Sequence, residues 1–246
     1  MKILLLGTGG YHPSQRRHTP CMLLPEPGVM LDAGTGVFRA AAHLRQPWLE
    51  IFLTHAHLDH VVGLTFLLST LHLRPLDRVR VHALPEVLRA VAEHLFAPAV
   101  FPVEPPFEMC PLPAVVELPG SGVLTHFPLE HPGGSIGYRL DWPGHSMAYV
   151  TDTTAAADAP YLDHIRGVDL LLHECYLPDS QADFARRTGH SVATPVAELA
   201  RRAKVGRLVL IHLNPLDVSD DPVGLDAARA IFARTMLGED QMELDF

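Results

Sequence analysis

Short apolar runs that end in glycine or polar residues constrain the fold of this chain more than any other feature. They are KILLLG (2–7), VMLDAGTG (29–36), EIFLTHAH (50–57), MAYVTDTT (147–154), DLLLHE (169–174) and RLVLIHLN (207–214). Runs of four or five apolar residues with such boundaries are typical of strands buried on both faces of a layered fold. We therefore expect a buried sheet rather than a helical bundle.

Four other segments have apolar residues at helical spacing. They are residues 57–73, 84–96, 194–206 and 221–238. Two of them begin near a proline and end at a glycine, the usual asymmetry of helix termini. A proline-rich stretch, 97–120, predicts surface loops with short strands, and QMELDF (241–246) predicts a closing edge strand. Strands alternating with helices indicate an α/β fold, and we expect a single domain over residues 1–246.

Composition excludes several classes of protein. Apolar residues make up 48% and charged residues 19%, which is globular composition. The formal charge of −9 argues against a broad basic surface for nucleic acid. Cys21, Cys110 and Cys175 form no CxxC pair and predict reduced thiols. The start has no signal-peptide pattern and no apolar stretch is long enough for a membrane span, so we expect a cytoplasmic protein.

Titratable residues fall at the ends of the predicted strands. Asp32, His55, Asp152, Glu174 and His212 each end or follow an apolar run. Because a sheet gathers strand ends along one rim, these side chains could converge although they are far apart in sequence.

The segment LTHAHLDHVVG (53–63) concentrates this chemistry. His55 and His57 are two residues apart in an extended segment and face the same side, whereas Asp59 and His60 follow on the turn into a helix. Imidazole nitrogens and carboxylate oxygens are the ligands that zinc takes when thiolates are absent. A polar loop that happens to be rich in histidine is the alternative.

The HxHxDH motif resembles the signature of the metallo-β-lactamase superfamily. LDAGTG with Asp32, PLEHPGG with His131, VTDTT with Asp152 and LIHLN with His212 follow in the order of that family. The resemblance implies the four-layer αββα sandwich and a dinuclear metal site, commonly two Zn²⁺, with Mn²⁺ or Fe²⁺ as alternatives. The ligands it implies are His55, His57 and His131 for one metal and Asp59, His60 and His212 for the other, with Asp152 as the bridge. Asp32 would support the site from beneath.

A second set of residues resembles the ribonuclease Z group of phosphodiesterases. HECYL (173–177) and the segment 188–212 carry Glu174 and His190, which match that group's proton-transfer dyad. GTGGYHPSQRRHT (7–19) is similar to its glycine turn and basic loop. Arg16, Arg17 and His18 in that loop could contact substrate phosphate or could simply be solvated.

The chain departs from the tRNA-processing members at one place. These carry a long arm that grips tRNA before the strand with the bridging aspartate, but here residues 136–152 leave room only for a hairpin turn at Pro143 and Gly144. The segment LNPLDV (213–218) also replaces the Ser-Arg-Tyr stretch of that group. The chain thus looks more like armless relatives such as the phosphodiesterase that accompanies carbon–phosphorus lyase.

The function predicted from these patterns is hydrolysis of a small or cyclic phosphodiester through a metal-bridging hydroxide. Two Zn²⁺, two aspartates and a hydroxide leave about +1, which suits a phosphodiester anion. The expected catalytic residues are His190, oriented by Glu174, together with Asp59. The expected partner is a small anionic phosphodiester, with neither a nucleic acid polymer nor a membrane; a homodimer is plausible.

Three alternatives remain open at this point. The first is a ribonuclease Z-type RNA 3′-end nuclease that lacks the arm. The second is a hydrolase of carboxylic esters, lactones or thioesters at the same metals. The third is a non-catalytic, metal-stabilised binding protein.

Overall fold

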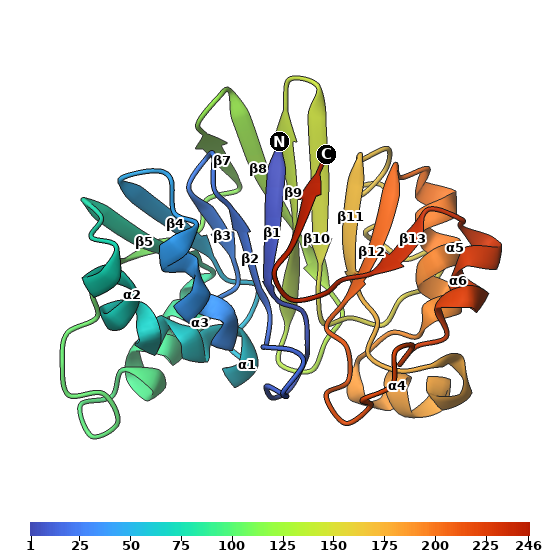
Figure 1. The fold of residues 1–246 in the computed structure, drawn as a ribbon, viewed down its shortest axis with the longest axis horizontal. Helices are drawn as coiled ribbons and strands as arrows, with labels where there is room; N and C mark the ends of the chain where they lie inside the picture. Colours follow the sequence, from blue (N-terminus) through green and yellow to red (C-terminus); the bar gives the residue numbers. More distant parts are fainter. The chain divides into compact units, whose positions relative to one another are not determined.

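A computed structural model describes residues 1–246, and the chain divides into two compact units. The N-terminal unit comprises Met1–Pro113 and Asp240–Asp245. The C-terminal unit comprises Ala114–Glu239 and Phe246. Each unit contains one seven-stranded mixed sheet (Figure 1). The expectation of a single domain stays a prediction.

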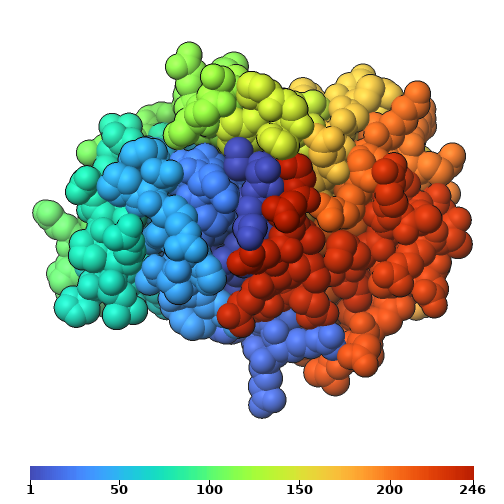
Figure 2. Space-filling model, turned by 45° about the horizontal axis from the view of Figure 1, so that its top comes forward, coloured from blue at the N-terminus to red at the C-terminus, as the bar shows by residue number.

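The sheet of the N-terminal unit has the order β14-β1-β2-β3-β4-β5-β6. Its strands are β1 (Lys2–Gly7), β2 (Cys21–Leu24), β3 (Val29–Leu31), β4 (Trp48–Phe52), β5 (Arg78–Ala83), β6 (Glu108–Pro111) and β14 (Met242–Asp245). Strands β3 to β6 are parallel, whereas β14, β1, β2 and β3 are antiparallel. The predicted closing strand is confirmed as β14 at the sheet edge, and Figure 2 shows this C-terminal segment in red against the dark blue N-terminus.

Helical segments of the N-terminal unit follow β3, β4 and β5. They are η1 (Thr35–Ala42), α1 (Leu58–Val61), η2 (Val62–Phe66), α2 (Leu67–Leu73), α3 (Pro85–Ala90) and the π-helical η3 (Val91–Leu95). The helical pattern over 57–73 is found as three successive helical segments from Leu58 to Leu73, the middle one a 3-10 helix. Gly63 donates its N–H to Ala33 at 2.8 Å, and a Cβ there would lie 2.0 Å from the Gly34 carbonyl oxygen. The backbone at Gly63 thus packs directly against the turn after β3, and a residue with a side chain would not fit there.

The sheet of the C-terminal unit has the order β13-β12-β11-β10-β9-β8-β7. Its strands are β7 (Val115–Leu118), β8 (Gly122–Leu129), β9 (Ser135–Trp142), β10 (His145–Val150), β11 (Leu170–Glu174), β12 (Arg207–Ile211) and β13 (Thr235–Leu237). Strands β10 to β13 are parallel and β7 to β10 antiparallel. Strands β6 and β7 confirm the short strands expected within the proline-rich stretch 97–120.

The helices of the C-terminal unit are η4 (Asp179–Gln181), α4 (Ala182–Thr188), α5 (Ala193–Ala203) and α6 (Leu225–Ile231), three of them labelled in Figure 1. The prediction of one helix over 221–238 is wrong in its second half. Helix α6 ends at Ile231, and Thr235 to Leu237 pair with β12 as a parallel strand. These residues have helical periodicity, but they form hydrogen bonds with a strand more than twenty residues away in sequence. Tertiary contacts therefore override the local helical preference here.

Each unit has its own apolar core. One core contains Val37, Leu64 and Val91 with the strands of the N-terminal sheet, and the other contains Val196 and Leu199 of α5 with the C-terminal sheet. Strands β1, β4, β11 and β12 contain consecutive buried residues, as expected for strands covered on both faces. The α/β class is therefore confirmed as two mixed sheets flanked by helices. No helix is long and apolar enough to cross a membrane.

Candidate metal centre

The parallel strands bring titratable residues to one edge of each sheet. In the N-terminal unit Asp32 follows β3 and His55 follows β4. In the C-terminal unit Asp152 follows β10, Glu174 ends β11 and His212 follows β12. Parallel neighbours end on the same side, so the expected gathering of strand ends is found within each unit.

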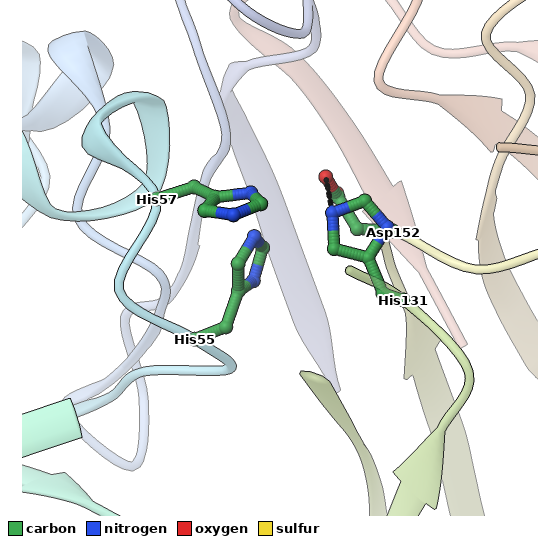
Figure 3. A group of neighbouring side chains, drawn as sticks. All are labelled: His55, His57, His131 and Asp152. Atoms are coloured by element: carbon green, nitrogen blue, oxygen red, sulfur yellow. Dashed lines mark ion pairs between the residues drawn. The ribbon is translucent and has the colours of Figure 1, made fainter. Parts of the chain in front are cut away.

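The histidine-rich turn after β4 is compact. The ring centroid of His55 lies 4.5 Å from that of His57 and 4.2 Å from that of His60. The Nε2 atom of His60 is 3.5 Å from Oδ2 of Asp59. His55 and His60 are buried whereas His57 is exposed, and Figure 3 shows His55 and His57 projecting from this one turn. The turn can thus offer several metal ligands from six residues.

Asp32 fixes the orientation of this turn from beneath. It is fully buried, and its backbone has a φ of 55°. Its Oδ1 accepts hydrogen bonds from the amide and hydroxyl of Thr54, and its Oδ2 accepts one from Nδ1 of His60 at 2.8 Å. Because Nδ1 carries the proton, Nε2 of neutral His60 has the lone pair that a metal requires. These hydrogen bonds agree with the supporting position that the resemblance implies for Asp32, and its role toward a metal stays a prediction.

Thr54 links Asp32 to His55 and so fixes the protonated nitrogen of that histidine too. Its hydroxyl donates to Asp32, so it must accept a hydrogen bond from Nδ1 of His55 at 3.0 Å. The lone pair of neutral His55 is therefore on Nε2 as well. Sequence reasoning missed Thr54; its place between the strand and the first histidine was a signal that could have identified it.

Asp152 lies between two histidines in the C-terminal unit. Its Oδ2 is 3.5 Å from Nε2 of His131, and its Oδ1 is 3.2 Å from Nε2 of His212. Figure 3 draws the contact with His131 as a dashed line. Each carboxylate oxygen is therefore directed to a different imidazole.

The contact between His131 and Asp152 tests whether a metal fits. Nδ1 of His131 is 3.0 Å from the carbonyl oxygen of Gly189, so that nitrogen must carry a proton. In the neutral ring, Nε2 is then an acceptor that faces a carboxylate acceptor. Two facing acceptors are stable only with a proton or a cation between them, and with histidine and carboxylate donors the residues fit a divalent metal.

Glu174 and His190, whose catalytic roles stay a prediction, lie within hydrogen-bond distance of each other. The carboxylate is completely buried, and its Oε1 is 3.2 Å from Nδ1 of His190. The same oxygen accepts the amides of Thr153 at 3.0 Å and Ser191 at 3.1 Å. With Nδ1 oriented toward the carboxylate, Nε2 is the nitrogen available to exchange a proton.

Aromatic rings surround His190. Tyr176 stacks on it with centroids 4.6 Å apart and an angle of 28°, and His212 lies 5.4 Å away on a nearly parallel plane. The ligand atoms of Asp152, His190 and His212 all lie within 4.8 Å of one another. His190 is therefore close to the expected ligands of its unit. Tyr176 was not identified from the sequence.

His173 has a different role from its neighbour Glu174. Its Nδ1 donates to the Glu174 carbonyl and its Nε2 accepts the hydroxyl of Tyr161, both within the buried interior. Burial lowers the pKa of His173 and raises that of Tyr161, so the ring is neutral. The two side chains have separate partners, as expected for neighbours that point to opposite faces of a strand.

The basic loop after β1 is built into the N-terminal unit. Arg17 is 5% exposed and donates to the hydroxyl of Thr8 at 2.6 Å, whereas Arg16 is exposed. Nδ1 of His18 is 3.0 Å from the hydroxyl of Thr35. Tyr11, with a φ of 63°, donates its backbone N–H to Oδ2 of Asp59 at 2.8 Å. Arg17 and His18 therefore stabilise the loop, and the loop in turn orients Asp59.

The position of the missing arm is a two-residue hairpin. Trp142 at the end of β9 pairs directly with His145 at the start of β10. Pro143 and Gly144 make the turn, and Gly144 has a φ of 84° that favours glycine. The structure thus agrees with the sequence that no long insertion separates these strands.

Two mixed sheets flanked by helices, with histidine and aspartate clusters at their strand ends, define a class of divalent-metal-binding α/β hydrolases. Residues 28–213 match the Beta-lactamase superfamily domain. The chain is 30% identical to a ribonuclease Z from Bradyrhizobium sp. (strain ORS 278), over 97% of each chain. The chain therefore belongs to the β-lactamase superfamily and to its ribonuclease Z-like branch, and it is a hydrolase.

Solved structures share the fold at lower identity. The metallo-β-lactamase fold protein YhfI from Bacillus subtilis superimposes with a TM-score of 0.81 and 17% identity, over 99% of both chains. A diphosphatase from the PhnP family gives a TM-score of 0.75 with 20% identity, covering 100% of this chain and 97% of that one. These similarities confirm the expected fold.

Proposed function

We propose that this protein is a dinuclear metal-dependent phosphodiesterase that hydrolyses a small or cyclic phosphodiester. The observation that supports it best is Asp152, whose two oxygens are directed to Nε2 atoms of two different histidines. A carboxylate arranged in this way suits a bridge between two cations, and family membership provides the same expectation.

The proposed ligands follow the family pattern at each position. One metal would be held by His55, His57 and His131 and the other by Asp59, His60 and His212, with Asp152 shared. The orientation of His55, His60 and His131, each with Nδ1 hydrogen-bonded to an oxygen, supports this assignment because all three present Nε2. Histidine and carboxylate donors suit Zn²⁺, and Mn²⁺ or Fe²⁺ can occupy the same donor set.

Two bound divalent ions would supply an activated water and stabilise the charge that develops on the phosphoryl oxygens. Side chains of the protein would hold these ions and donate a proton to the leaving group. Asp59 would bind the second metal, and the Tyr11 amide holds its Oδ2 in place. His190 donates a proton to the departing alkoxide, and Glu174 holds its Nδ1 so that Nε2 faces the reaction.

A small substrate is favoured by the hairpin at Pro143 and Gly144 and by the net charge of −9. The alignment to the Bradyrhizobium ribonuclease Z runs over 302 positions although this chain has 246 residues. That relative therefore has segments without a counterpart here. A diphosphatase with the same fold gives a precedent for a smaller phosphate substrate.

The test is hydrolysis of bis-p-nitrophenyl phosphate by protein of measured metal content, beside a phosphomonoester, a lactone and a thioester. We expect preference for the diester with two metals per chain. Turnover of carbon esters alone, with a diester neither substrate nor inhibitor, would replace the proposal with the ester hydrolase. Two bound metals with no turnover across the panel would favour a binding protein.

The second candidate is an RNA 3′-end nuclease, which the ribonuclease Z relatives favour. It is tested by cleavage of a precursor tRNA with a 3′ trailer and by retention of that RNA at low salt. Cleavage at a catalytic rate exceeding that for the small diester would make this candidate the better description.

A further inference from the structure

An apolar cavity lies in the N-terminal unit beside the histidine-rich turn. Its volume is about 250 Å³. Val61 and Val91 in its lining are buried, whereas Leu58 and His94 are exposed and therefore belong to its mouth. Of the two side chains at the mouth, Leu58 is next in sequence to the expected metal ligands His57 and Asp59.

Alternate residues of the histidine-rich turn belong to the ligand cluster and to the cavity lining. His55 and His57 place their rings together, whereas Ala56 and Leu58 line the cavity. Leu58 at the mouth follows the exposed His57 directly in sequence. The cavity and the ligand cluster therefore share one short turn of the chain.

An uncommon backbone feature forms another part of the lining. After α3 the chain continues as the π-helical segment η3, in which Phe96 donates to the Val91 carbonyl at 3.0 Å. Ala90, Val91 and His94 from this region line the cavity. π-Helical turns are rare and often occur at functional sites, because the wider turn changes where side chains point.

The chemistry of the lining selects the ligand. Apart from His94 at the mouth, the lining side chains are aliphatic and carry no charge. Such a surface binds an apolar group and disfavours an ionised one that would lose its water. The volume is below the 300–1,000 Å³ or so of a pocket for a complete drug-sized ligand, so it suits one ring or one branched alkyl group.

We infer that this cavity is a specificity pocket for an aromatic or branched-alkyl group on one ester oxygen of the phosphodiester. The inference rests on the proposed function and narrows it to diesters with at least one apolar substituent. Its test compares phenyl p-nitrophenyl phosphate with methyl p-nitrophenyl phosphate, which release the same leaving group and differ in the substituent that stays.

The test variant is Ala90→Leu, which fills the cavity from a half-buried helical position. Ala92→Leu, at an exposed position two residues later that does not line the cavity, is the matched control. We expect wild type and control to prefer the phenyl diester in kcat/KM by about tenfold or more. Ala90→Leu should lose that preference, while its turnover of the methyl diester and its metal content stay within about twofold. Equal losses on both diesters would overturn the inference.

A binding measurement separates this inference from the proposed function. Phenylphosphonate and methylphosphonate are titrated into the metal-loaded protein while the methyl NMR signals of Val61 and Val91 are followed. The phenyl compound should shift both signals in wild type and Ala92→Leu but not in Ala90→Leu. If no diester is hydrolysed and these shifts occur, the phosphodiesterase proposal fails and the pocket stands. If diesters are hydrolysed and the shifts do not occur, the pocket fails alone.

Discussion

Two completely buried carboxylates, Asp32 and Glu174, occupy comparable positions in the two units. Each lies at the carboxyl end of a parallel strand and contacts Nδ1 of a histidine. Their hydrogen bonding differs. Both oxygens of Asp32 accept hydrogen bonds from the protein, whereas Oε1 of Glu174 accepts three and its Oε2 accepts none from the protein.

From this difference in hydrogen bonding we infer that one carboxylate has a structural role and the other a catalytic role. A buried carboxylate whose two oxygens both accept hydrogen bonds from the protein is held in one orientation, and removing it leaves several donors unsatisfied. Oε2 of Glu174 has no donor from the protein, and a buried polar atom of this kind calls for a specific explanation such as a catalytic role. Asp32 should thus matter most for folding and metal binding, and Glu174 most for turnover.

Asp32→Ala should have the largest effect on stability. It leaves the Thr54 amide and Nδ1 of His60 without their acceptor, which should lower the free energy of unfolding by about 2–4 kcal/mol. Urea denaturation and metal analysis would measure the two losses. Asp163→Ala, at an exposed carboxylate, is the control and should change stability by less than about 0.5 kcal/mol. Unchanged stability in Asp32→Ala would remove its role as a support.

His190→Ala should have the largest effect on turnover without loss of metal. Removal of a general acid typically lowers kcat about 10²–10⁴-fold. His212→Ala is the comparison variant and should lose bound metal as well, because His212 is an expected ligand. Loss of metal in His190→Ala would instead make His190 a ligand, an arrangement that its proximity to Asp152 allows.

Glu174→Gln removes the negative charge next to His190 and keeps the shape of the side chain. Its carbonyl oxygen can still accept the three hydrogen bonds of Oε1, and its amide would replace the oxygen that has no partner. Stability should therefore change by only about 1 kcal/mol, while kcat falls at least about tenfold. The same change at the other carboxylate, Asp32→Asn, should destabilise more. Equal effects of the two substitutions in urea would contradict the comparison.

The smallest expected effect is in the labelling of the cysteine thiols. Two of these thiols lie near Asp32 and Glu174, so their reactivity reports on both carboxylate sites. Burial raises the pKa of Cys21 and of Cys175, with contributions from Asp32 and Glu174 respectively. Since the thiolate is the reactive form, neither should react with Ellman's reagent at pH 8 in the native protein. Partly exposed Cys110 should react slowly, and all three thiols should react in denaturant. Rapid labelling of two or more native thiols would show that a carboxylate site opens readily.

Much of the fold was predictable because its signals are local. The apolar runs at 2–7, 50–57 and 169–174 correspond to β1, β4 and β11, since a buried strand needs consecutive apolar residues. The helical pattern over 57–73 gives helical segments from Leu58 to Leu73, but the 3-10 segment around Gly63, whose N–H bonds to Ala33 after β3, is not contained in a local pattern. Likewise Thr235 to Leu237 look helical but pair with β12.

The sequence by itself determined the superfamily, the residues expected to bind metal and the absence of a long insertion before β10. These depend on residue types at fixed spacing along the chain. Only the tertiary structure decided that Thr54 links Asp32 to His55, that Asp152 divides its oxygens between two histidines, and that Glu174 leaves one oxygen without a donor. The physical reason is that the geometry of these hydrogen bonds and ion contacts is set by how the strands and loops pack, and residue spacing alone does not specify that packing.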